Sequence, residues 1–421
     1  MKISIFETRT VPTIKIENQQ NNLIFHSKYD PMREVNAWCK NALEEIKPLE
    51  EIVIIGLAAG YHVIQLAEAL PGKNITVIEF NEIFYKWFKK SPFSVKIKEM
   101  NNVKVKHFGN ISKEQRLNIF STIPSTNLLI HKNGLDIMPT EYMQVKGILE
   151  DIQFQKKSIN NQIENMKSNF FKNVALNDNG IGNLKNKYLG KPMILISAGP
   201  SLDKQLDLLK KIHYENKIIL GAVGTAIKPL IKNNIIPDFF SIIDPNPETL
   251  NQLKDTYLPE TTLFYLSTAY HETIMLHKGP RKIMWQKGFE DAEKLAVKLG
   301  DPMIQTGGSV ATALLDLMVY LGAGKLALVG QDLAFTDNLS HAQHTHAQRN
   351  IGEVNFGYKT INYHRNGYVT TAKNLTIYRK WFEYYALVHT NLELYNCTEG
   401  GAYINNWKHV KLDQFYKKVI Q

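Results

Sequence analysis

Cysteine is scarce in this chain, and long apolar runs are missing. The two cysteines, Cys39 and Cys397, lie far apart and form no C-x-x-C spacing, which excludes a disulfide framework and a zinc knuckle. The first residues, Met1-Lys-Ile-Ser-Ile-Phe6, lack the apolar core of a signal peptide. No apolar run reaches the roughly 18 residues that a membrane-spanning helix needs. We therefore expect a cytoplasmic protein without a membrane span.

Negative charge is also under-represented, with 40 Asp and Glu against 50 Lys and Arg, which gives a formal net charge of +10. This excess either reflects a composition rich in Lys and Asn or attracts an anionic ligand or an acidic partner. The basic residues form no dense run and no nucleic-acid-binding motif occurs, so nucleic acid is not an expected partner. A hydrophobic content of 44% in 421 residues predicts a folded chain. Its length suits about two or three domains.

A strand, a glycine turn, a helix and a second strand follow one another near the N-terminus. Residues 52–55 predict a buried strand, Gly56-Leu-Ala-Ala-Gly60 a turn, and residues 75–79 the next strand. This order is typical of a Rossmann-like unit, in which Glu79 takes the place of a ribose-binding acid. The turn lacks the middle glycine that permits close approach of a ligand, so a purely structural sheet is the favoured alternative.

The predicted elements divide the chain into four parts. An N-terminal Rossmann-like domain covers residues 1–138, and connecting helices cover residues 139–185. Strands then alternate with helices, which predicts a central, doubly wound α/β domain over residues 186–350. Residues 351–421 form a C-terminal region that packs on this domain. The strands of the central domain are expected at residues 193–197, 218–223, 239–243, 262–266 and 325–329.

Small or polar residues follow most strands of the predicted central sheet. Because parallel strands end at the same edge, these turns are expected to converge on one ligand cleft. Glycine in a turn lets the backbone approach a ligand, and N–H groups at a helix start attract phosphate or carboxylate. The turns are Ser197-Ala-Gly-Pro-Ser-Leu202, Gly224-Thr225, Asp244-Pro-Asn-Pro247, Thr306-Gly-Gly-Ser309 and Gly330-Gln-Asp332.

Several of these features also have simpler explanations. The run Gly307-Gly-Ser309 suits an anion at a helix start, but an ordinary helix cap explains it as well. Asp244 suits a ribose hydroxyl, a metal or an acceptor hydroxyl, and an Asx turn before proline is its alternative. His341, His344 and His346 suggest zinc, yet no Cys or H-E-x-x-H accompanies them. A solvated loop or a catalytic histidine is preferred there, and His341 is the candidate because it lies nearest the last of the turns.

Together these motifs resemble the motility accessory factor (Maf) family of flagellin glycosyltransferases. This family is related to bacterial sialyltransferases and to 6-hydroxymethylpterin diphosphokinase-like proteins. The motifs occur in the family's order over nearly the whole chain; one departure from the sialyltransferase pattern is Ser197, which replaces the first glycine of Gly-x-Gly-Pro-Ser-Leu. The matching segments are His26-Ser-Lys-Tyr-Asp-Pro-Met-Arg-Glu34, the turn from Gly56 to His62, Ser197-Ala-Gly-Pro-Ser-Leu202, Pro237-Asp238 through Asp244-Pro245, Thr306-Gly-Gly-Ser-Val310, Val329-Gly-Gln-Asp-Leu-Ala-Phe-Thr336 with Ser340-His341-Ala342, and Asn396-Cys-Thr-Glu-Gly-Gly-Ala402.

The resemblance implies a fold and an activity. The fold is an N-terminal Rossmann-like domain, a central sialyltransferase-like (GT-A-like) catalytic domain and a helical C-terminal region. The activity is transfer of a pseudaminic, legionaminic or Kdo-type ulosonic acid from its CMP-activated form to Ser or Thr of flagellin, in flagellum assembly and motility. Flagellin and the CMP-ulosonic acid are the implied partners. No cofactor is required, although Asp244 with Asp332 is a pair that would hold magnesium.

The same resemblance, with the chemistry of the transfer, suggests roles for individual residues. The acceptor hydroxyl needs a base, for which Asp244 and His341 are the catalytic candidates. Glu399 is a candidate for acceptor or loop contact, and no residue is assigned to a bound metal. The candidates for donor binding are Ser197, Gly199, Pro200, Ser201, Leu202, Thr225, Gly307, Gly308, Ser309, Gln331 and Asp332.

Two other functions remain open at this point. A 6-hydroxymethylpterin diphosphokinase shares the Gly-Pro-Ser-Leu and Asp-Pro features and would need ATP and magnesium. A flagellin-binding chaperone without turnover is the non-enzymatic alternative. The additional N-terminal domain favours the flagellin glycosyltransferase.

Overall fold

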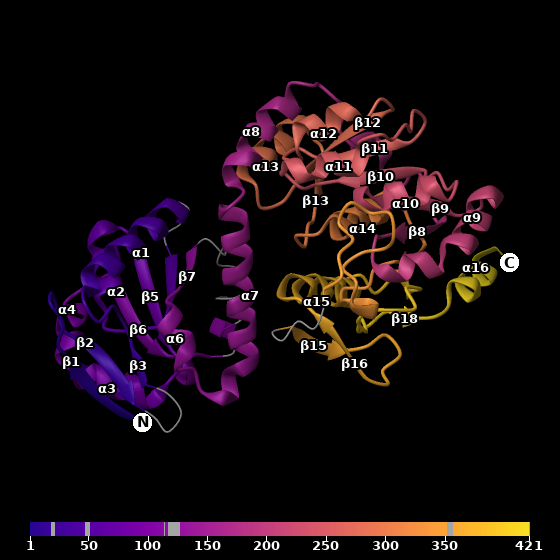
Figure 1. The fold of residues 1–421 in the computed structure, drawn as a ribbon. Helices are drawn as coiled ribbons and strands as arrows, with labels where there is room; N and C mark the ends of the chain where they lie inside the picture. Colours follow the sequence, from indigo (N-terminus) through magenta and orange to yellow (C-terminus); the bar gives the residue numbers. More distant parts are fainter. Residues whose placement is uncertain (18–21, 47–50, 113, 117–126, 352–356, 421) are drawn as a thin grey trace. The chain divides into compact units, whose positions relative to one another are not determined.

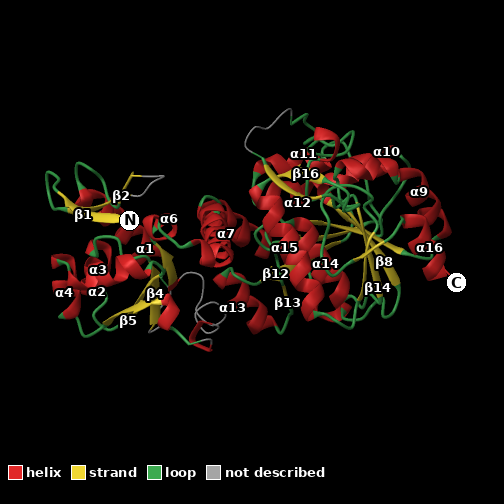
Figure 2. Ribbon diagram, turned by 90° about the horizontal axis from the view of Figure 1, so that it is seen from below, coloured by secondary structure: helices red, strands yellow, loops and turns green. Residues whose placement is uncertain are grey.

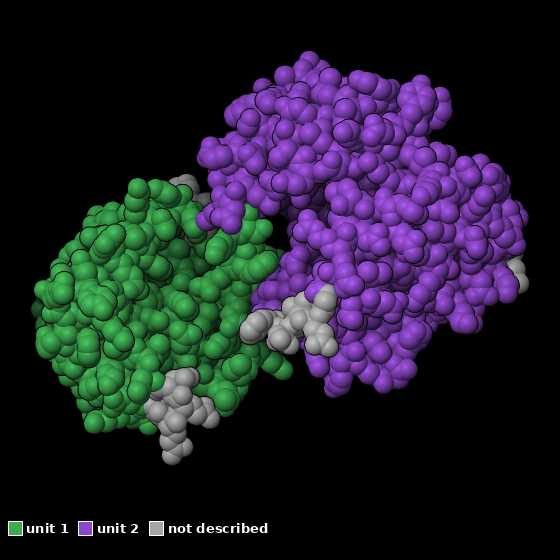
Figure 3. Space-filling view, in the orientation of Figure 1, with its two compact units in different colours: residues 1–158 green, residues 159–421 purple. Residues whose placement is uncertain are grey.

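The chain divides into two compact units in the computed structural model. The structure describes residues 1–17, 22–46, 51–112, 114–116, 127–351 and 357–420. Unit 1 is Met1–Ser158 and unit 2 is Ile159–Gln421 (Figure 3). The finer division into four parts stays a prediction. Within the described residues, no helix is both long and apolar enough to cross a membrane.

A parallel four-stranded sheet forms the centre of unit 1 (Figure 1). The chain starts in the middle of this sheet, adds two strands on one side, and then adds the last strand on the other side. All four strands run in the same direction. After β6 the chain crosses to the other side of β4, where β7 is added. In spatial order the strands are β6 (Val103–His107), β5 (Asn74–Glu79), β4 (Glu51–Ile55) and β7 (Leu128–Ile130).

Helices and a small antiparallel sheet complete unit 1. Helix α1 (Pro31–Glu45) begins with proline in its first turn, and the side chain of Asp30 accepts a hydrogen bond from the N–H of Arg33. The small sheet contains β1 (Lys2–Phe6), β2 (Thr13–Glu17) and β3 (Asn22–Ile24). The other helices are α2 (Tyr61–Ala69), α3 (Glu82–Lys90), α4 (Val95–Lys98), α6 (Lys132–Asp136) and α7 (Met143–Asn160).

Unit 2 is built on a nine-stranded sheet whose described strands all run parallel. The five predicted strands are present, and β12 and β13 were not predicted. The resulting mixed α/β architecture agrees with the predicted fold class. In spatial order the strands are β13 (Met303–Ile304), β12 (Arg281–Gln286), β11 (Thr262–Leu266), β10 (Phe239–Ile242), β9 (Ile219–Val223), β8 (Pro192–Ile196), β14 (Lys325–Val329), β17 (Glu393–Asn396) and β18 (Lys408–His409).

Helices cover both faces of this sheet, which explains its continuous apolar strands. Residues 193–196 of β8 are all fully buried, as expected where a parallel sheet meets helices on either side. Figure 2 shows α14 on one side of β8 and β14, and α9 and α16 on the other. The helices of unit 2 are α8 (Ile163–Val174), α9 (Leu206–Glu215), α10 (Ile227–Lys232), α11 (Leu250–Leu253), α12 (His271–Leu276), α13 (Glu290–Leu299), α14 (Val310–Tyr320), α15 (Lys373–Val388) and α16 (Leu412–Ile420).

The C-terminal region is mixed rather than helical, which corrects the prediction. It contains α15 and α16, but β17 and β18 extend the central sheet beyond β14. A separate antiparallel pair, β15 (Tyr358–Ile361) and β16 (Tyr368–Thr371), precedes α15. The apolar signal of β17 is limited to Leu394 and Tyr395, which is too short to distinguish a buried strand from a loop.

The side chain of Glu79 is hydrogen-bonded to the backbone of the glycine turn of unit 1. Its side chain is fully buried, and its carboxylate accepts hydrogen bonds from the N–H groups of Leu57 (3.3 Å) and Asn81 (2.9 Å). Burial raises the pKa of Glu79 to about 7. A carboxylate that is already used by the backbone of its own turn favours the structural alternative over a ribose contact.

We expect the charge of Glu79 to oppose folding at neutral pH. Its pKa rises from 4.5 to about 7 in the folded protein, so the native state binds the proton more tightly, and stability is lost as pH rises through this interval. The free energy of unfolding of the wild type should fall by about 3 kcal/mol relative to Glu79→Gln between pH 4.5 and 7. Urea unfolding across this range measures the difference. The exposed Glu44→Gln is the control, and parallel pH profiles for wild type and Glu79→Gln would contradict the expectation.

Candidate functional site

The order of strand addition reverses in unit 2 between β8 and β14. The chain starts at β8, proceeds outward through β9 to β13, and returns to the other side of β8 with β14. Ligands bind at such a point in open α/β sheets, outside the carboxyl ends of the strands. The turns that follow β8 and β14, residues 197–202 and 330–332, meet at this edge.

A cavity of about 320 Å³ lies at this edge and is lined by residues from several predicted turns. Its volume is at the lower end of the range for small-molecule sites, about 300–1,000 Å³. The structure therefore brings together turns that are distant in sequence, as the parallel sheet predicts. The predicted site residues that line it are Ser197, Gly199, Thr225, Ser309, Gln331, Asp332 and His341.

The protein atoms around Gly199 leave no room for a side chain at this position. A Cβ atom on Gly199 would lie 2.1 Å from Oδ1 of Asp332 and 2.6 Å from the carbonyl oxygen of Gly330. The N–H of Gly199 donates to that same carbonyl oxygen at 2.7 Å. The turn after β14 thus fills the space next to Gly199. The sequence analysis expected a ligand in that space.

The N–H groups of residues 199–202 are already occupied. The N–H of Ser201 lies 3.3 Å from each carboxylate oxygen of Asp332, and the N–H of Leu202 donates to Gly199 at 3.0 Å. Pro200 has no N–H, and the segment Pro200–Lys204 is a 3₁₀ turn rather than the start of an α-helix. Pro200, Ser201 and Leu202 are buried and do not line the cavity. These contacts favour a structural role for the N–H groups of Ser201 and Leu202, and phosphate binding by this turn stays a prediction.

Asp332 joins the two turns from below the cavity. Its carboxylate accepts hydrogen bonds from the hydroxyl groups of Ser201 (2.6 Å) and Thr336. Only 2% of Asp332 is exposed, and burial raises the pKa of its carboxyl to about 6. Asp332 thus orders the site, and its oxygens are engaged by protein donors.

Ser197 positions the side chain of Gln331. The Ser197 hydroxyl donates to Oε1 of Gln331, and the N–H of Gln331 donates to the hydroxyl of Thr398 at 3.3 Å. Since the amide oxygen is held by Ser197, the amide nitrogen is the group of Gln331 that can donate to a ligand. The replacement of glycine by Ser197 therefore adds an orienting hydrogen bond at the cavity wall.

The Gly307-Gly-Ser309 run is a helix cap whose end faces the cavity. Ser309 is the N-cap of α14 and forms a capping box with Thr312, and the N–H of Gly307 donates to the Thr312 hydroxyl at 2.9 Å. Gly307 and Gly308 do not line the cavity, and a Cβ on Gly307 would lie 2.5 Å from the ring of Trp381. Residues 309–311 do line it, so the positive end of the α14 dipole faces the ligand space.

His341 and Asp244 differ in their relation to the cavity. His341 lines it, is half-buried, and its Nδ1 is buried with no hydrogen-bond partner among the described residues. Burial lowers the pKa of His341, which keeps the imidazole neutral. Asp244 does not line the cavity, and its Oδ1 accepts from the N–H of Asn246 at 2.9 Å, which is the Asx turn. Asp244 is exposed, although the surrounding protein raises the pKa of its carboxyl.

Other predicted residues have structural partners. Glu399 accepts hydrogen bonds from Nε2 of Gln205 (3.1 Å) and the N–H of Leu412 (3.3 Å), away from the cavity lining. His344 is hydrogen-bonded to the ammonium group of Lys232 at 3.1 Å. In the described part of the chain, no group of three or more metal-binding side chains forms at this cavity.

Helix α15 provides a wall of the cavity that the sequence interpretation missed. Asn374, Leu375 and Tyr378 line the cavity, and none of them was among the predicted site residues. Tyr378 follows Asn374 by four residues and Leu375 by three, which places the three side chains on one helix face. This spacing is the feature of the sequence from which the wall could have been predicted.

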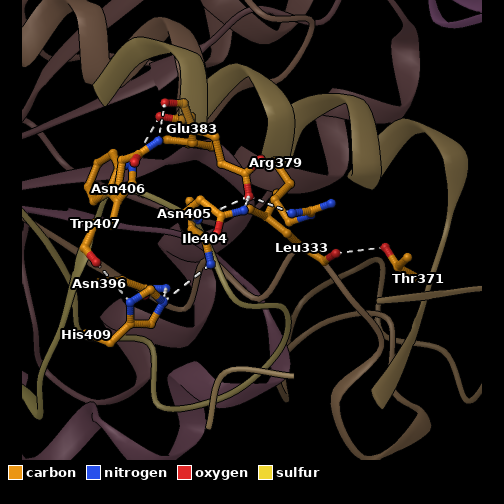
Figure 4. A network of polar contacts seen from close by, with 11 residues as sticks. Leu333, Thr371, Arg379, Glu383, Asn396, Ile404, Asn405, Asn406, Trp407 and His409 are labelled. Atoms are coloured by element: carbon orange, nitrogen blue, oxygen red, sulfur yellow. Dashed lines mark hydrogen bonds and ion pairs between the residues drawn. The ribbon is translucent and has the colours of Figure 1, made fainter. Parts of the chain in front are cut away.

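A polar network fixes α15 and the loop opposite it (Figure 4). Glu383 of α15 pairs with Arg379 and accepts from the backbone N–H (3.1 Å) and side-chain amide (2.8 Å) of Asn405. The hydroxyl of Thr371 donates to the carbonyl of Leu333 at 2.8 Å, and Leu333 itself lines the cavity. The C-terminal region is thereby held against the edge of the sheet that carries the site.

Gly199→Ala should destabilise unit 2 even without a ligand. The new Cβ would collide with Asp332 and with the backbone of Gly330, and overpacking of this kind costs about 1–3 kcal/mol. Thermal unfolding of the ligand-free protein measures the loss. Gly367→Ala is the matched control, because its Cβ would meet its nearest neighbour at an ordinary 3.5 Å. Equal stability of the two variants would show that the glycine serves a ligand only.

Comparisons with known proteins agree with this architecture. Residues 164–338 match the family model described as 6-hydroxymethylpterin diphosphokinase MptE-like. The structure is similar to that of the Maf glycosyltransferase from Magnetospirillum magneticum AMB-1, with a TM-score of 0.55 and 16% sequence identity over 92% of this chain. The similarity spans 65% of that protein's chain, and no curated protein matches the sequence. The predicted resemblance is thus supported at the level of the fold, and residues 164–338 are similar to the MptE-like family model.

Proposed function

We propose that this protein is a glycosyltransferase that moves an ulosonic acid from its CMP-activated form to Ser or Thr of flagellin in the cytoplasm. The observation that carries the proposal is the cavity between β8 and β14, where a neutral histidine, an oriented amide and a helix N-terminus face one ligand space. The similarity in fold to a Maf glycosyltransferase supports this assignment. The net charge of +10 favours approach of an anionic donor.

The donor would be held mainly by α14 and by the turns after β9 and β14. The N-terminus of α14 at residues 309–311 suits the phosphate or the carboxylate of the donor, because the helix dipole is positive there. Thr225, in the turn Gly224–Ala226 after β9, and Gln331 supply polar contacts for the nucleotide or the sugar. Gly199 and Asp332 contribute by holding the wall in place.

His341 is the proposed general base. A bond forms between the acceptor oxygen and the anomeric carbon, and the bond from that carbon to the phosphate oxygen breaks, so that CMP leaves. The hydroxyl proton passes to the imidazole, which the lowered pKa of His341 keeps neutral and able to accept it.

A pair of substitutions separates the two candidate bases. His341→Gln should lower the transfer rate at least about 100-fold, because general base catalysis contributes about 10²–10⁴-fold. Asp244→Asn keeps an oxygen for the N–H of Asn246 and should retain the rate within about threefold. His344→Gln, outside the cavity lining, is the control. A large loss in Asp244→Asn with an active His341→Gln would reverse the assignment.

The activity itself is tested by co-expression with flagellin and a pathway for each CMP-ulosonic acid. We expect the intact mass of flagellin to increase by the mass of the transferred sugar. An unchanged mass with every candidate donor would contradict the proposal.

The family-model match over residues 164–338 makes a pterin diphosphokinase the second candidate. It predicts transfer of pyrophosphate from ATP to 6-hydroxymethylpterin in the presence of magnesium. Product formation in that assay without any change in flagellin mass would favour it. Flagellin binding without turnover in either assay would instead indicate a chaperone.

A further inference from the structure

Three histidines from distant parts of unit 1 meet in its interior. His26 follows β3, His62 is the second residue of α2, and His131 directly follows β7. The ring centroid of His131 lies 4.4 Å from that of His62 and 5.2 Å from that of His26. One nitrogen from each ring lies within 4.8 Å of the other two. The cluster is therefore a convergent set of imidazoles.

The cluster lies where the order of strand addition reverses in the sheet of unit 1. His62 follows the turn after β4, and His131 follows β7, the strand added on the opposite side of β4. The N–H of His131 donates to the carbonyl of Ile55 at the end of β4, at 2.9 Å. This edge corresponds to the ligand-binding position of open α/β sheets. Unit 1 thus places histidines where unit 2 places its cavity.

The imidazole nitrogens of this cluster lack partners despite their burial. His62 is fully buried, and His26 and His131 are each 4% exposed. In the described residues, Nδ1 of all three rings and Nε2 of His26 are buried without a hydrogen-bond partner. Leaving a buried polar group unpaired costs about 1–3 kcal/mol, so several in one place call for a bound species.

The hydrogen bond of His62 defines which of its nitrogens is available. Its Nε2 lies 3.2 Å from the carbonyl oxygen of Gly56, which can only accept, so Nε2 carries the proton and Nδ1 has the lone pair. A ligating histidine typically donates its second N–H to a carbonyl or carboxylate in this way.

We infer that His26, His62 and His131 form a binding site for a divalent transition-metal ion, with Zn²⁺ as the best fit to three imidazoles. This inference goes beyond the proposed function and does not depend on it. Tetrahedral zinc with Zn–N distances of about 2.0–2.1 Å needs nitrogens about 3.3 Å apart. The present spacing, within 4.8 Å, requires only small ring movements to reach this geometry.

Glu34 is the carboxylate that lies next to His26 at the edge of the cluster. Its Oε1 lies 3.8 Å from Nδ1 of His26, and its Oε2 accepts from the N–H of Ser27 at 2.7 Å. At 3.8 Å the carboxylate makes no hydrogen bond to Nδ1, so both ring nitrogens of His26 are available to a metal ion. A cavity of about 670 Å³, lined by His26 and Glu34, provides the entry path.

Cobalt and zinc titrations of the full chain test the site. The protein is first treated with a chelator and dialysed, and Co²⁺ is then added while visible absorption is recorded. We expect one equivalent of Co²⁺ to produce the absorption of a tetrahedral site, and Zn²⁺ to displace it. Zn²⁺ should also raise the melting temperature, since it binds the folded state.

Single substitutions within and outside the cluster provide the comparison. His62→Asn and His131→Asn should weaken Zn²⁺ binding by more than the roughly 10–100-fold that loss of an outer-shell partner costs. His107→Asn is the matched control, because His107 is also buried in unit 1, with Nε2 3.2 Å from the carbonyl of Phe80, but lies outside the cluster. Its affinity should match that of the wild type.

X-ray absorption of the zinc-loaded wild type keeps the test valid if a variant fails to fold. It should report three imidazole nitrogens at about 2.0–2.1 Å. The inference is overturned if the folded wild type binds no stoichiometric metal. It is also overturned if folded His62→Asn and His131→Asn bind as tightly as His107→Asn. Because flagellin modification is not measured here, failure of this site and failure of the proposed function are distinguishable.

Discussion

The carboxylate of Asp332 connects the two turns on which the cavity of unit 2 depends. It accepts hydrogen bonds from Ser201, in the turn after β8, and from Thr336, beyond the turn after β14. Gly199 leaves room for it, and the chain after β17 packs against its backbone at Gly401. These contacts come from the chain after β8, β14 and β17, so the carboxylate is buried only when these three neighbouring strands are assembled. Its raised pKa is the electrostatic cost of that position.

Both units use the same topological device with different chemistry. In each, a parallel sheet starts from an inner strand, and a later strand is added on the opposite side, at β4 and β7 or at β8 and β14. The second unit lines this position with hydroxyl, amide and helix-terminal groups, which suit an anionic organic ligand. The first lines it with imidazoles, which suit a metal ion. The shared topology defines the position in each sheet, and the residues after each strand give that position its chemistry.

Much of this arrangement could be predicted from sequence, because it rests on local patterns. Apolar runs locate β11 and β14 at the same residues as the structure does, and the convergence of turns follows from parallel pairing. What the sequence could not show is which polar groups are already used. The N–H of Ser201 and the carboxylate of Glu79 are occupied by partners that burial and distant strands bring close. Patterns of a few residues carry no information about such contacts.

The histidine cluster shows a second limit of prediction from the sequence. Its members are separated by 36 and 69 positions, so no spacing rule marks them as a set, whereas the local run of His341, His344 and His346 attracted a metal interpretation. In unit 2, the wall contributed by Tyr378 was missed because one aromatic face of α15 packs on the core and the same spacing serves both purposes. Contacts between remote segments, rather than local composition, separate these cases.

The cavity wall formed by α15 lies outside the part of the chain that matches the family model. The part of the chain that matches the MptE-like model ends at residue 338, before His341 and before Asn374 and Tyr378. A common core therefore supplies the floor of the ligand space, while a separate downstream segment supplies one wall and the proposed base. The same downstream segment also supplies β17 and β18, which extend the central sheet beyond β14. The ligand space and the sheet are therefore completed by the same part of the chain.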